Sequence, residues 1–210
     1  MTGDGSDDGH EPTASRLPRP PDFDAIAAAA PASLDRRSEI LALIGHLVFS
    51  WSNNESLFIY VLMILLETDE VSAAIVFATL NTTRARLDLV QRLAKAKIGD
   101  AALSRELDVL VGRFSKQTKL RNDLNHCMYT VNEKGEITHT QLMKLEERRG
   151  ALSFGRTREM DGARLDEMRR AVEEHGALNR DLWACLPRLE AHLASRRRRR
   201  PETSPPGREA

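Results

Sequence analysis

The sequence predicts an all-α fold: a bundle of four to five helices with a small β-hairpin insertion late in the chain. From residue 34 to residue 194, apolar residues recur mostly at spacings of three and four, the period of helices with one buried face. Between about residues 128 and 158 the pattern changes to the alternation of short strands. With 210 residues and 41% hydrophobic content, the chain can bury one core of ordinary size.

The two ends of the chain differ from this domain in composition. Residues 1–32 contain mainly Gly, Asp, Pro, Ser and Ala, so they cannot offset the entropy of becoming ordered. We expect a disordered leader over residues 1–32, a helical domain over 33–195 and a disordered, Arg-rich tail over 196–210. The run Arg196–Arg200 could hold a phosphate backbone, although such runs are more often solvated chain ends.

Charge and cysteine content limit the classes of function. Lys plus Arg and Asp plus Glu number 31 each, so nucleic acid would be attracted only by local patches. Cys127 and Cys185 form no CxxC pair or other metal-ligand spacing, and we expect no disulfide framework, no metal and no cofactor. The chain does not open with a basic start and an apolar run, so the predicted location is the cytoplasm.

The first helix should begin near Ser33 or Asp35, which are good N-cap residues. Its buried stripe continues for more than seven turns and includes one charged residue, Glu55. Since an unpaired buried carboxylate is costly, we expect Glu55 to brace Arg121 on another helix. Alternatively, the helix breaks at Ser52-Asn53-Asn54 and Glu55 caps a second helix. The apolar members of the stripe are Ile40, Leu43, Ile44, Leu47, Val48, Trp51, Phe58, Val61, Leu62 and Leu65.

A fully apolar run from Leu57 to Leu66 follows in the same helix. It is too short to span a bilayer and too apolar for a helix with one wet face. We therefore expect no membrane insertion and infer that a second apolar surface of this helix mediates self-association into a homodimer.

Two shorter helices are expected next, over residues 69–80 and 84–98, separated by Asn81-Thr82-Thr83. Gly99-Asp100 should end the second of these and cap the following helix. The outward side of the second helix is basic and could lie along RNA, although a solvated helix face is the commoner case. Its basic residues are Arg84, Arg86, Arg92, Lys95 and Lys97.

The helix expected over residues 101–128 turns polar along its buried face. Its stripe contains Leu103, Leu107, Leu110, Val111 and Phe114 and continues through Gln117, Thr118, Arg121 and Leu124 or Asn125. Because buried polar groups need partners, this end should face a site, a polar network or a second subunit. The alternative is a frayed, solvated helix end.

The sequence at this end of the helix is Arg121-Asn122-Asp123-Leu124-Asn125-His126. At about 100° per residue, Arg121 and Asn125 share a face, as do Asn122 and His126, while Arg121 and His126 lie roughly 140° apart. Four polar, catalytically capable side chains therefore cluster within about one and a half turns.

Strands are expected over residues 128–131 and 137–141, joined by a Gly-containing turn, with a third over 151–154. The hairpin could wall the site, and His139 is either an auxiliary site residue or a strand-surface residue.

Asp161 should cap a last helix that continues to about Ala194, with a kink or an end at Pro187. His175 and His192 are expected to face solvent. The predicted core set of this helix is Leu165, Met168, Val172, Leu178, Leu182, Leu186 and Leu189.

The polar interruption in the first long helix and the pattern Arg-Asn-x-x-x-His near the end of a later one resemble the HEPN superfamily, over about residues 34–194. The resemblance implies a helical bundle that dimerises so that two motif copies face a shared cleft, and metal-independent cleavage of RNA. On this chain, Arg121 would contact the scissile phosphate, His126 would act as acid or base, and Asn122 would orient them or the RNA. Asp123 and Asn125 would either touch substrate or close the helix.

The chemistry also suits the residues themselves. RNA carries its own nucleophile, the 2′-hydroxyl, histidine exchanges protons near neutral pH, and a fixed guanidinium can neutralise charge on the phosphorane oxygens. The expected products are a 2′,3′-cyclic phosphate and a 5′-hydroxyl, formed by a toxin or defence effector.

One position departs from the family pattern. HEPN toxins that a partner nucleotidyltransferase controls carry Tyr two residues after the His, whereas this chain has Met128 there and Tyr129 one later. We therefore expect regulation by some other antitoxin or regulatory protein. Cys127 is expected to be a small core residue, with redox control as the alternative.

Two other functions fit the sequence. The first is a non-catalytic HEPN-like dimer that serves as a nucleotide-binding or protein-interaction module, with Arg121 and Glu55 as a structural ion pair. The second is a helical nucleic-acid-binding protein that acts through the Arg tail and residues 84–97.

Overall fold

The computed structural model describes residues 34–148 and 150–199. This part of the chain is mostly helical with a small antiparallel sheet, which confirms the coarse fold class. The helices are α2 (Leu34–Leu66), α3 (Glu70–Thr79), α4 (Thr83–Lys97), α5 (Ala101–Asn125) and α6 (Gly162–Arg199). The strands are β1 (Cys127–Val131), β2 (Ile137–Leu142), β3 (Leu145–Arg148), β4 (Ala151–Phe154) and β5 (Thr157–Glu159).

Short polar side chains start the helices where the sequence predicts. Asp69 accepts a hydrogen bond from the Ser72 N–H (2.9 Å) and starts α3. Thr82 caps α4, and Asp100 caps α5 through two backbone N–H groups. Asp161 accepts from the Arg164 N–H (2.8 Å) at the start of α6. Each cap satisfies a backbone donor that has no partner inside the helix.

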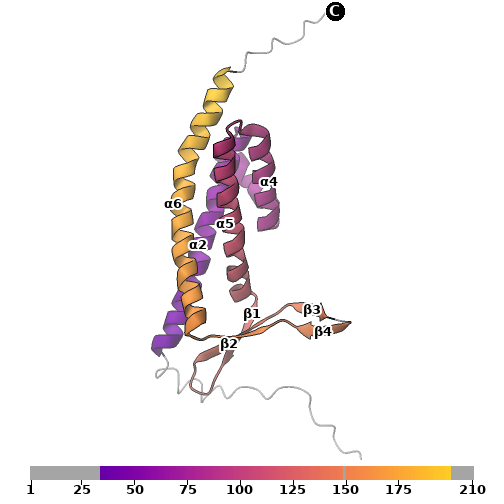
Figure 1. Ribbon diagram of the computed structural model, residues 1–210, viewed down its shortest axis with the longest axis vertical. Coiled ribbons are helices and arrows are strands. Elements are labelled where there is room, and N and C mark those ends of the chain that lie inside the picture. Colours follow the sequence, from indigo (N-terminus) through magenta and orange to yellow (C-terminus); the bar gives the residue numbers. More distant parts are fainter. Residues whose placement is uncertain (1–33, 149, 200–210) are drawn as a thin grey trace, which may run out of the picture.

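The first helix, α2, is continuous through residues 52–54, so the predicted alternative of a break there is wrong. It runs beside α5 and α6 along the long axis of the molecule (Figure 1) and also contacts α3 and α4. These helices bury much of its apolar run within one chain: Leu57, Phe58, Val61, Leu62 and Leu65 are each at most 4% exposed. Burial of this run therefore does not require a second subunit, and self-association stays a prediction.

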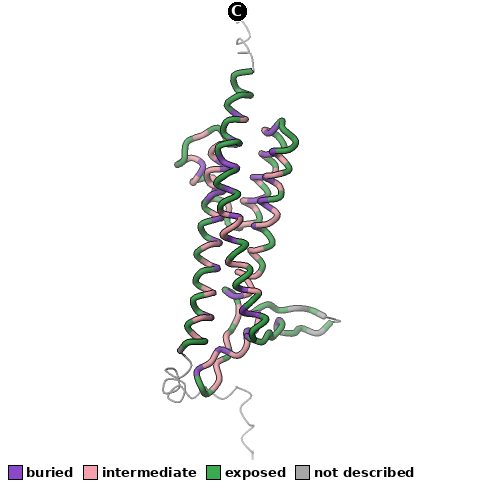
Figure 2. The backbone as a smooth tube through the Cα atoms, turned by 60° about the vertical axis from the view of Figure 1, so that its left-hand side comes forward, coloured by how far each residue is buried: buried purple, intermediate pink, exposed green. Residues whose placement is uncertain are grey.

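Two apolar cores lie along the bundle, and Figure 2 shows the buried positions along the facing sides of the helices. The larger core joins all five helices. The smaller core joins the first half of α2, the end of α5 and the start of α6 to the sheet. Its buried members are Ile40, Leu47, Leu124, Ile137, Met160, Leu165 and Met168.

The small sheet has the antiparallel order β1-β2-β5, and β3 pairs with β4 in a separate hairpin. This hairpin projects sideways from the bundle (Figure 1). The first hairpin and the third strand confirm the prediction. The sequence pattern missed β3 and β5 because their sequences, LEER and TRE, contain one apolar residue between them, whereas β4, ALSF, is mainly apolar.

Three expectations about α6 need correction. It does not end at Pro187 or near Ala194 but continues to Arg199, so the segment expected as a tail from residue 196 is helical up to that point. His175 is fully buried instead of solvent-facing. Its backbone carbonyl accepts from the Asn54 amide nitrogen (3.0 Å), and Asn179 in turn donates to the Asn54 side-chain oxygen (2.8 Å).

The expected leader, residues 1–32, and the end of the tail, residues 200–210, lie outside the described residues. Within residues 34–148 and 150–199, no helix combines the length and apolar content needed to cross a bilayer.

Candidate functional site

The motif lies where α5 meets the sheet, at one end of the bundle (Figure 1). The Arg121 guanidinium carbon is 3.9 Å from the centre of the Trp51 ring, so the cation stacks on the indole of α2. Its Nη1 donates a hydrogen bond to the Asn122 side-chain oxygen (2.9 Å). Arg121 and Asn122 are therefore brought together, as the sequence predicts.

Trp51 is itself held firmly. It is 5% exposed, and its Nε1–H donates to the Thr118 hydroxyl (3.0 Å), which in turn donates to the Phe114 carbonyl. Its ring also stacks on Phe114, with centroids 5.5 Å apart. These contacts give Arg121 a rigid aromatic support. The sequence predicts Trp51 only as a member of the buried apolar stripe of the first helix. The signal in the sequence is that Trp51 and Arg121 each lie on the inward stripe of their own helix.

Two buried polar atoms beside this support have no partner. The Arg121 Nε and the Gln117 side-chain oxygen, one turn apart on α5, form no hydrogen bond within the described part of the chain. Buried polar atoms in folded proteins are almost always paired. The Arg164 Nε and the His175 Nε2, elsewhere among the described residues, are buried and unpaired as well, so this state alone does not mark a ligand site.

Glu55 does not brace Arg121, and that expectation is wrong. Its carboxylate accepts from the Thr83 hydroxyl (2.7 Å) and from Arg86 Nη1 (3.0 Å), both at the start of α4. Arg86 lies partly buried over the Phe77 ring, at 4.3 Å from its centroid, although the sequence pattern placed it outward. The reason is packing: α4 contacts α2 and brings these donors to Glu55. Arg121 consequently has no carboxylate partner among the described residues.

His126 is the C-cap residue of α5, because the helix ends three residues earlier than predicted. Its N–H donates to the Asn122 carbonyl (3.0 Å), and its own carbonyl accepts from the Met143 N–H (3.0 Å). The backbone is thus fixed on both sides. The imidazole is exposed and forms no hydrogen bond or ion pair with another described residue. An exposed imidazole without a protein partner is accessible to a substrate.

The other motif residues differ in exposure. Asp123 is half-buried and Asn125 is exposed, and neither side chain contacts Arg121 by a hydrogen bond within the described residues.

Cys127 and Tyr129 follow the motif and point to the same acceptor. The Cys127 Sγ (3.2 Å) and the Tyr129 hydroxyl (2.7 Å) both donate to the Leu124 carbonyl. Desolvation raises the pKa of both side chains, so both stay protonated at neutral pH. A protonated thiol is a poor nucleophile, which argues against redox control. Cys127 is half-buried and belongs to neither apolar core, so it is not the core residue expected.

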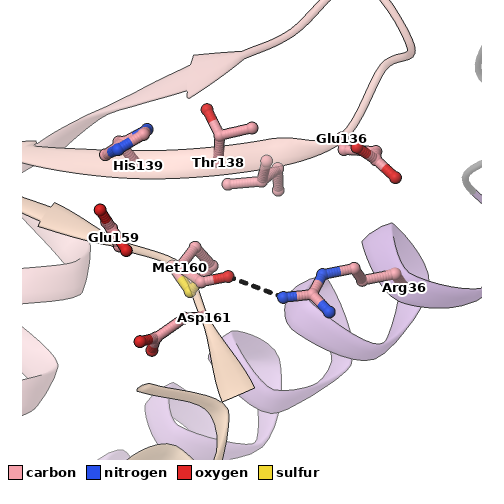
Figure 3. A pocket seen from close by; sticks show the side chains of 8 residues that line it. Arg36, Glu136, Thr138, His139, Glu159, Met160 and Asp161 are labelled. Carbon is pink, nitrogen blue, oxygen red and sulfur yellow. Dashed lines mark hydrogen bonds between the residues drawn. The ribbon is translucent and has the colours of Figure 1, made fainter. Parts of the chain in front are cut away.

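His139 lies elsewhere, in a cavity of about 380 Å³ between β2, β5 and the start of α2 (Figure 3). There it stands opposite Glu159 in the strand pairing, and Arg36 Nη2 donates to the Met160 carbonyl (2.9 Å). The lining of this cavity includes neither Arg121 nor His126. The described residues contain no group of three His, Cys, Asp or Glu placed to hold a metal ion.

Comparison with known proteins found no matching family model, curated protein or solved structure. The geometry of the site and the motif that resembles the HEPN superfamily are therefore the grounds for a proposed function.

Proposed function

We propose that this protein is a metal-independent endoribonuclease of the HEPN type that acts in the cytoplasm as a toxin or defence effector. It cuts RNA by attack of the 2′-hydroxyl on the adjacent phosphate and leaves 2′,3′-cyclic phosphate and 5′-hydroxyl ends. The proposal rests on the motif together with one structural observation, the state of Arg121.

The guanidinium of Arg121 is fixed in place by neighbouring side chains, but no carboxylate neutralises it. Arg121 is supported by the Trp51 face and the Asn122 amide, while Glu55, the acid expected beside it, is occupied by Arg86. An arginine that served as a structural ion pair would have an acidic partner. A fixed, unneutralised guanidinium instead suits a phosphate, which it can bind in a bidentate manner.

Each chemical role in the reaction then has a residue. Arg121 stabilises the negative charge that builds on the phosphorane oxygens. The exposed His126 imidazole removes the proton from the 2′-hydroxyl or returns one to the leaving 5′-oxygen. Asn122 orients the guanidinium through the hydrogen bond between their side chains. Asp123 and Asn125 line the approach to His126 or close the helix.

Transesterification needs both a proton acceptor and a proton donor, and one motif supplies a single imidazole. A homodimer with two facing motifs would supply a second one. The homodimer that the resemblance implies is therefore part of the proposal.

The test is cleavage of single-stranded RNA in the presence of EDTA by the full chain and by His126→Ala. The wild type should yield 2′,3′-cyclic phosphate and 5′-hydroxyl ends, and His126→Ala should yield none while its circular dichroism and oligomeric state stay unchanged. His46→Ala, at another exposed histidine, this one within α2, is the control and should keep full activity.

Equal behaviour of His126→Ala and wild type would reject the proposal and favour the non-catalytic module. Products with 3′-hydroxyl and 5′-phosphate ends would also reject it, because they require a different, hydrolytic mechanism.

A further inference from the structure

The end of the bundle opposite the motif carries a dense basic cluster. The last helix, α6, extends past the other helices there (Figures 1 and 2), and its final described residues are Arg196–Arg199. This end adjoins a cavity of about 800 Å³ beside the last turn of α4. Four of the lining residues are Lys or Arg and one is acidic, Glu67: the four cations are Lys97, Arg196, Arg197 and Arg199.

Two of the arginines fasten α6 to the bundle. The Arg196 guanidinium donates to the Lys97 carbonyl, one of the carbonyls left unpaired at the end of α4. It also lies close over Gly99, where an added Cβ would be 3.3 Å from its Nη1. Arg197 Nη2 donates to Glu67 (2.8 Å), which also faces Lys97 Nζ at 3.4 Å. The Glu67 carboxylate therefore pairs with Arg197 and Lys97.

The other two arginines have no such role. Arg198 and Arg199 are exposed and form no hydrogen bond or ion pair with the described residues. Arginines that only complemented the helix dipole would act on the stability of α6 and on nothing else. Arg199 lines the cavity of about 800 Å³, whereas Arg198 lines the adjoining one, of about 510 Å³, together with Glu190. Two free guanidiniums at an end of the bundle where cations outnumber carboxylates form a site for anionic oxygens.

We propose that this basic end binds the phosphodiester backbone of the single-stranded RNA substrate through Arg198 and Arg199, a proposal that rests on the proposed ribonuclease function. The apolar residues that line the cavity are Ala96 and Leu193, and Leu193 is 7% exposed. The adjoining cavity at Arg198 adds Met63 and Ile64, which are partly buried against the larger core. None of these large apolar side chains is exposed for insertion into lipid, which favours a nucleic-acid backbone over a membrane surface.

The two sites are separated by the length of α5. Its 25 residues correspond to roughly 37 Å at about 1.5 Å per residue. RNA held at the basic end would therefore contact the protein far from the bond that is cut, and the contact would raise affinity without entering the chemistry.

The experiment measures binding of a fluorescent single-stranded RNA at several salt concentrations, in the non-cleaving His126→Ala background so that the RNA stays intact. Arg198→Gln/Arg199→Gln is compared with Arg170→Gln/Arg180→Gln, which removes two exposed arginines from the same helix nearer its start. Both variants lose the same total charge, and Gln preserves helix propensity.

For single strands, the slope of log affinity against log salt changes by about 0.7 for each phosphate contact. We expect Arg198→Gln/Arg199→Gln to reduce the slope by about 1.4 and the control pair to leave it near the parent value. Equal losses in the two variants, or none in the first, would overturn the proposal. Loss of binding to phosphatidylserine vesicles with an unchanged RNA slope would overturn it in favour of a membrane contact.

This test is independent of the cleavage assay. If wild type fails to cut RNA but the slope change is seen, the ribonuclease proposal falls and the binding site stands. If wild type cuts RNA and the slope is unchanged, the binding site falls alone.

Discussion

Arg121 on α5 stacks on Trp51 of α2, with 3.9 Å between the guanidinium carbon and the ring centre. Tryptophan provides the most favourable aromatic face for a cation, and this one is fixed by Thr118 and Phe114. The contact joins the two helices at the motif and leaves the guanidinium edge free of any acidic partner within the described residues.

The stack should be measurable as a coupling between the two side chains. In a double-mutant cycle with Trp51→Leu and Arg121→Met, we expect a coupling of about 1 kcal/mol in the free energy of unfolding by urea. Trp51→Leu alone should lower the free energy of unfolding by roughly 3 kcal/mol because a buried ring is lost. It should also slow RNA cleavage about tenfold because Arg121 loses its support. Trp183→Leu, at a 54% exposed tryptophan, should change neither the free energy of unfolding nor the cleavage rate. A coupling indistinguishable from zero would refute the stabilising role of the stack.

Glu55→Gln should act on stability and leave cleavage intact. Glu55 and Arg86 side chains are 13% and 20% exposed, so removing the carboxylate leaves a largely desolvated cation and should cost roughly 2–3 kcal/mol. Asp88→Asn, which breaks the exposed pair with Arg92 (57% and 78% exposed), is the control and should cost less than about 0.5 kcal/mol. Thermal unfolding and cleavage rates below the melting temperature measure both effects. A large loss of cleavage with unchanged stability would restore the predicted brace between Glu55 and Arg121.

Acid should destabilise the fold through His175. Burial lowers the pKa of this fully buried imidazole from 6.5 to about 4. Between these values the unfolded chain binds the proton more readily than the folded one, so stability present above pH 6.5 is lost as the pH falls towards 4. This shift corresponds to roughly 3 kcal/mol. Urea unfolding at pH 7 and pH 4 should therefore show a loss about 3 kcal/mol larger in wild type than in His175→Gln, and equal losses would contradict the assignment.

Gly155 should not tolerate a side chain. A Cβ there, in the connection between β4 and β5, would lie 2.8 Å from the Leu142 carbonyl oxygen, so Gly155→Ala should destabilise the protein by roughly 1–3 kcal/mol. Gly45 in α2 has nothing within 4 Å of the same position, and Gly45→Ala should stabilise by roughly 0.5–1 kcal/mol. Paired thermal denaturation curves measure the opposite signs. A neutral Gly155→Ala would show that the strand connection moves freely.

Much of the secondary structure could be predicted because its causes are local. The caps at Asp69, Thr82, Asp100 and Asp161 lie beside the groups they bond. Periodicity identified inward positions such as Leu107, Phe114 and Leu178, all at most 1% exposed. The predicted end of α5 lies three residues too late, because the chain passes from the helix into β1 after His126 and β1 pairs with β2. Strand pairing is not a local property of the sequence.

The candidate site divides in the same way. The motif residues could be singled out from their order, and Arg121 and Asn122 do interact. The sequence predicts Arg121 as the partner of Glu55, which is wrong, and gives Trp51 no role in the site. The reason is that a stripe identifies the inward face of a helix without identifying the residues that pack on it.

The sequence by itself determined which segments are helical, where most of them begin, and that Arg121 lies on a buried face. Only the tertiary structure decided that Arg86 forms an ion pair with Glu55, that Arg121 stacks on Trp51 and that His175 is buried beside Asn54. The physical reason is that propensity and period act between residues a few positions apart, whereas these partners are 31, 70 and 121 positions apart and meet only when whole helices pack.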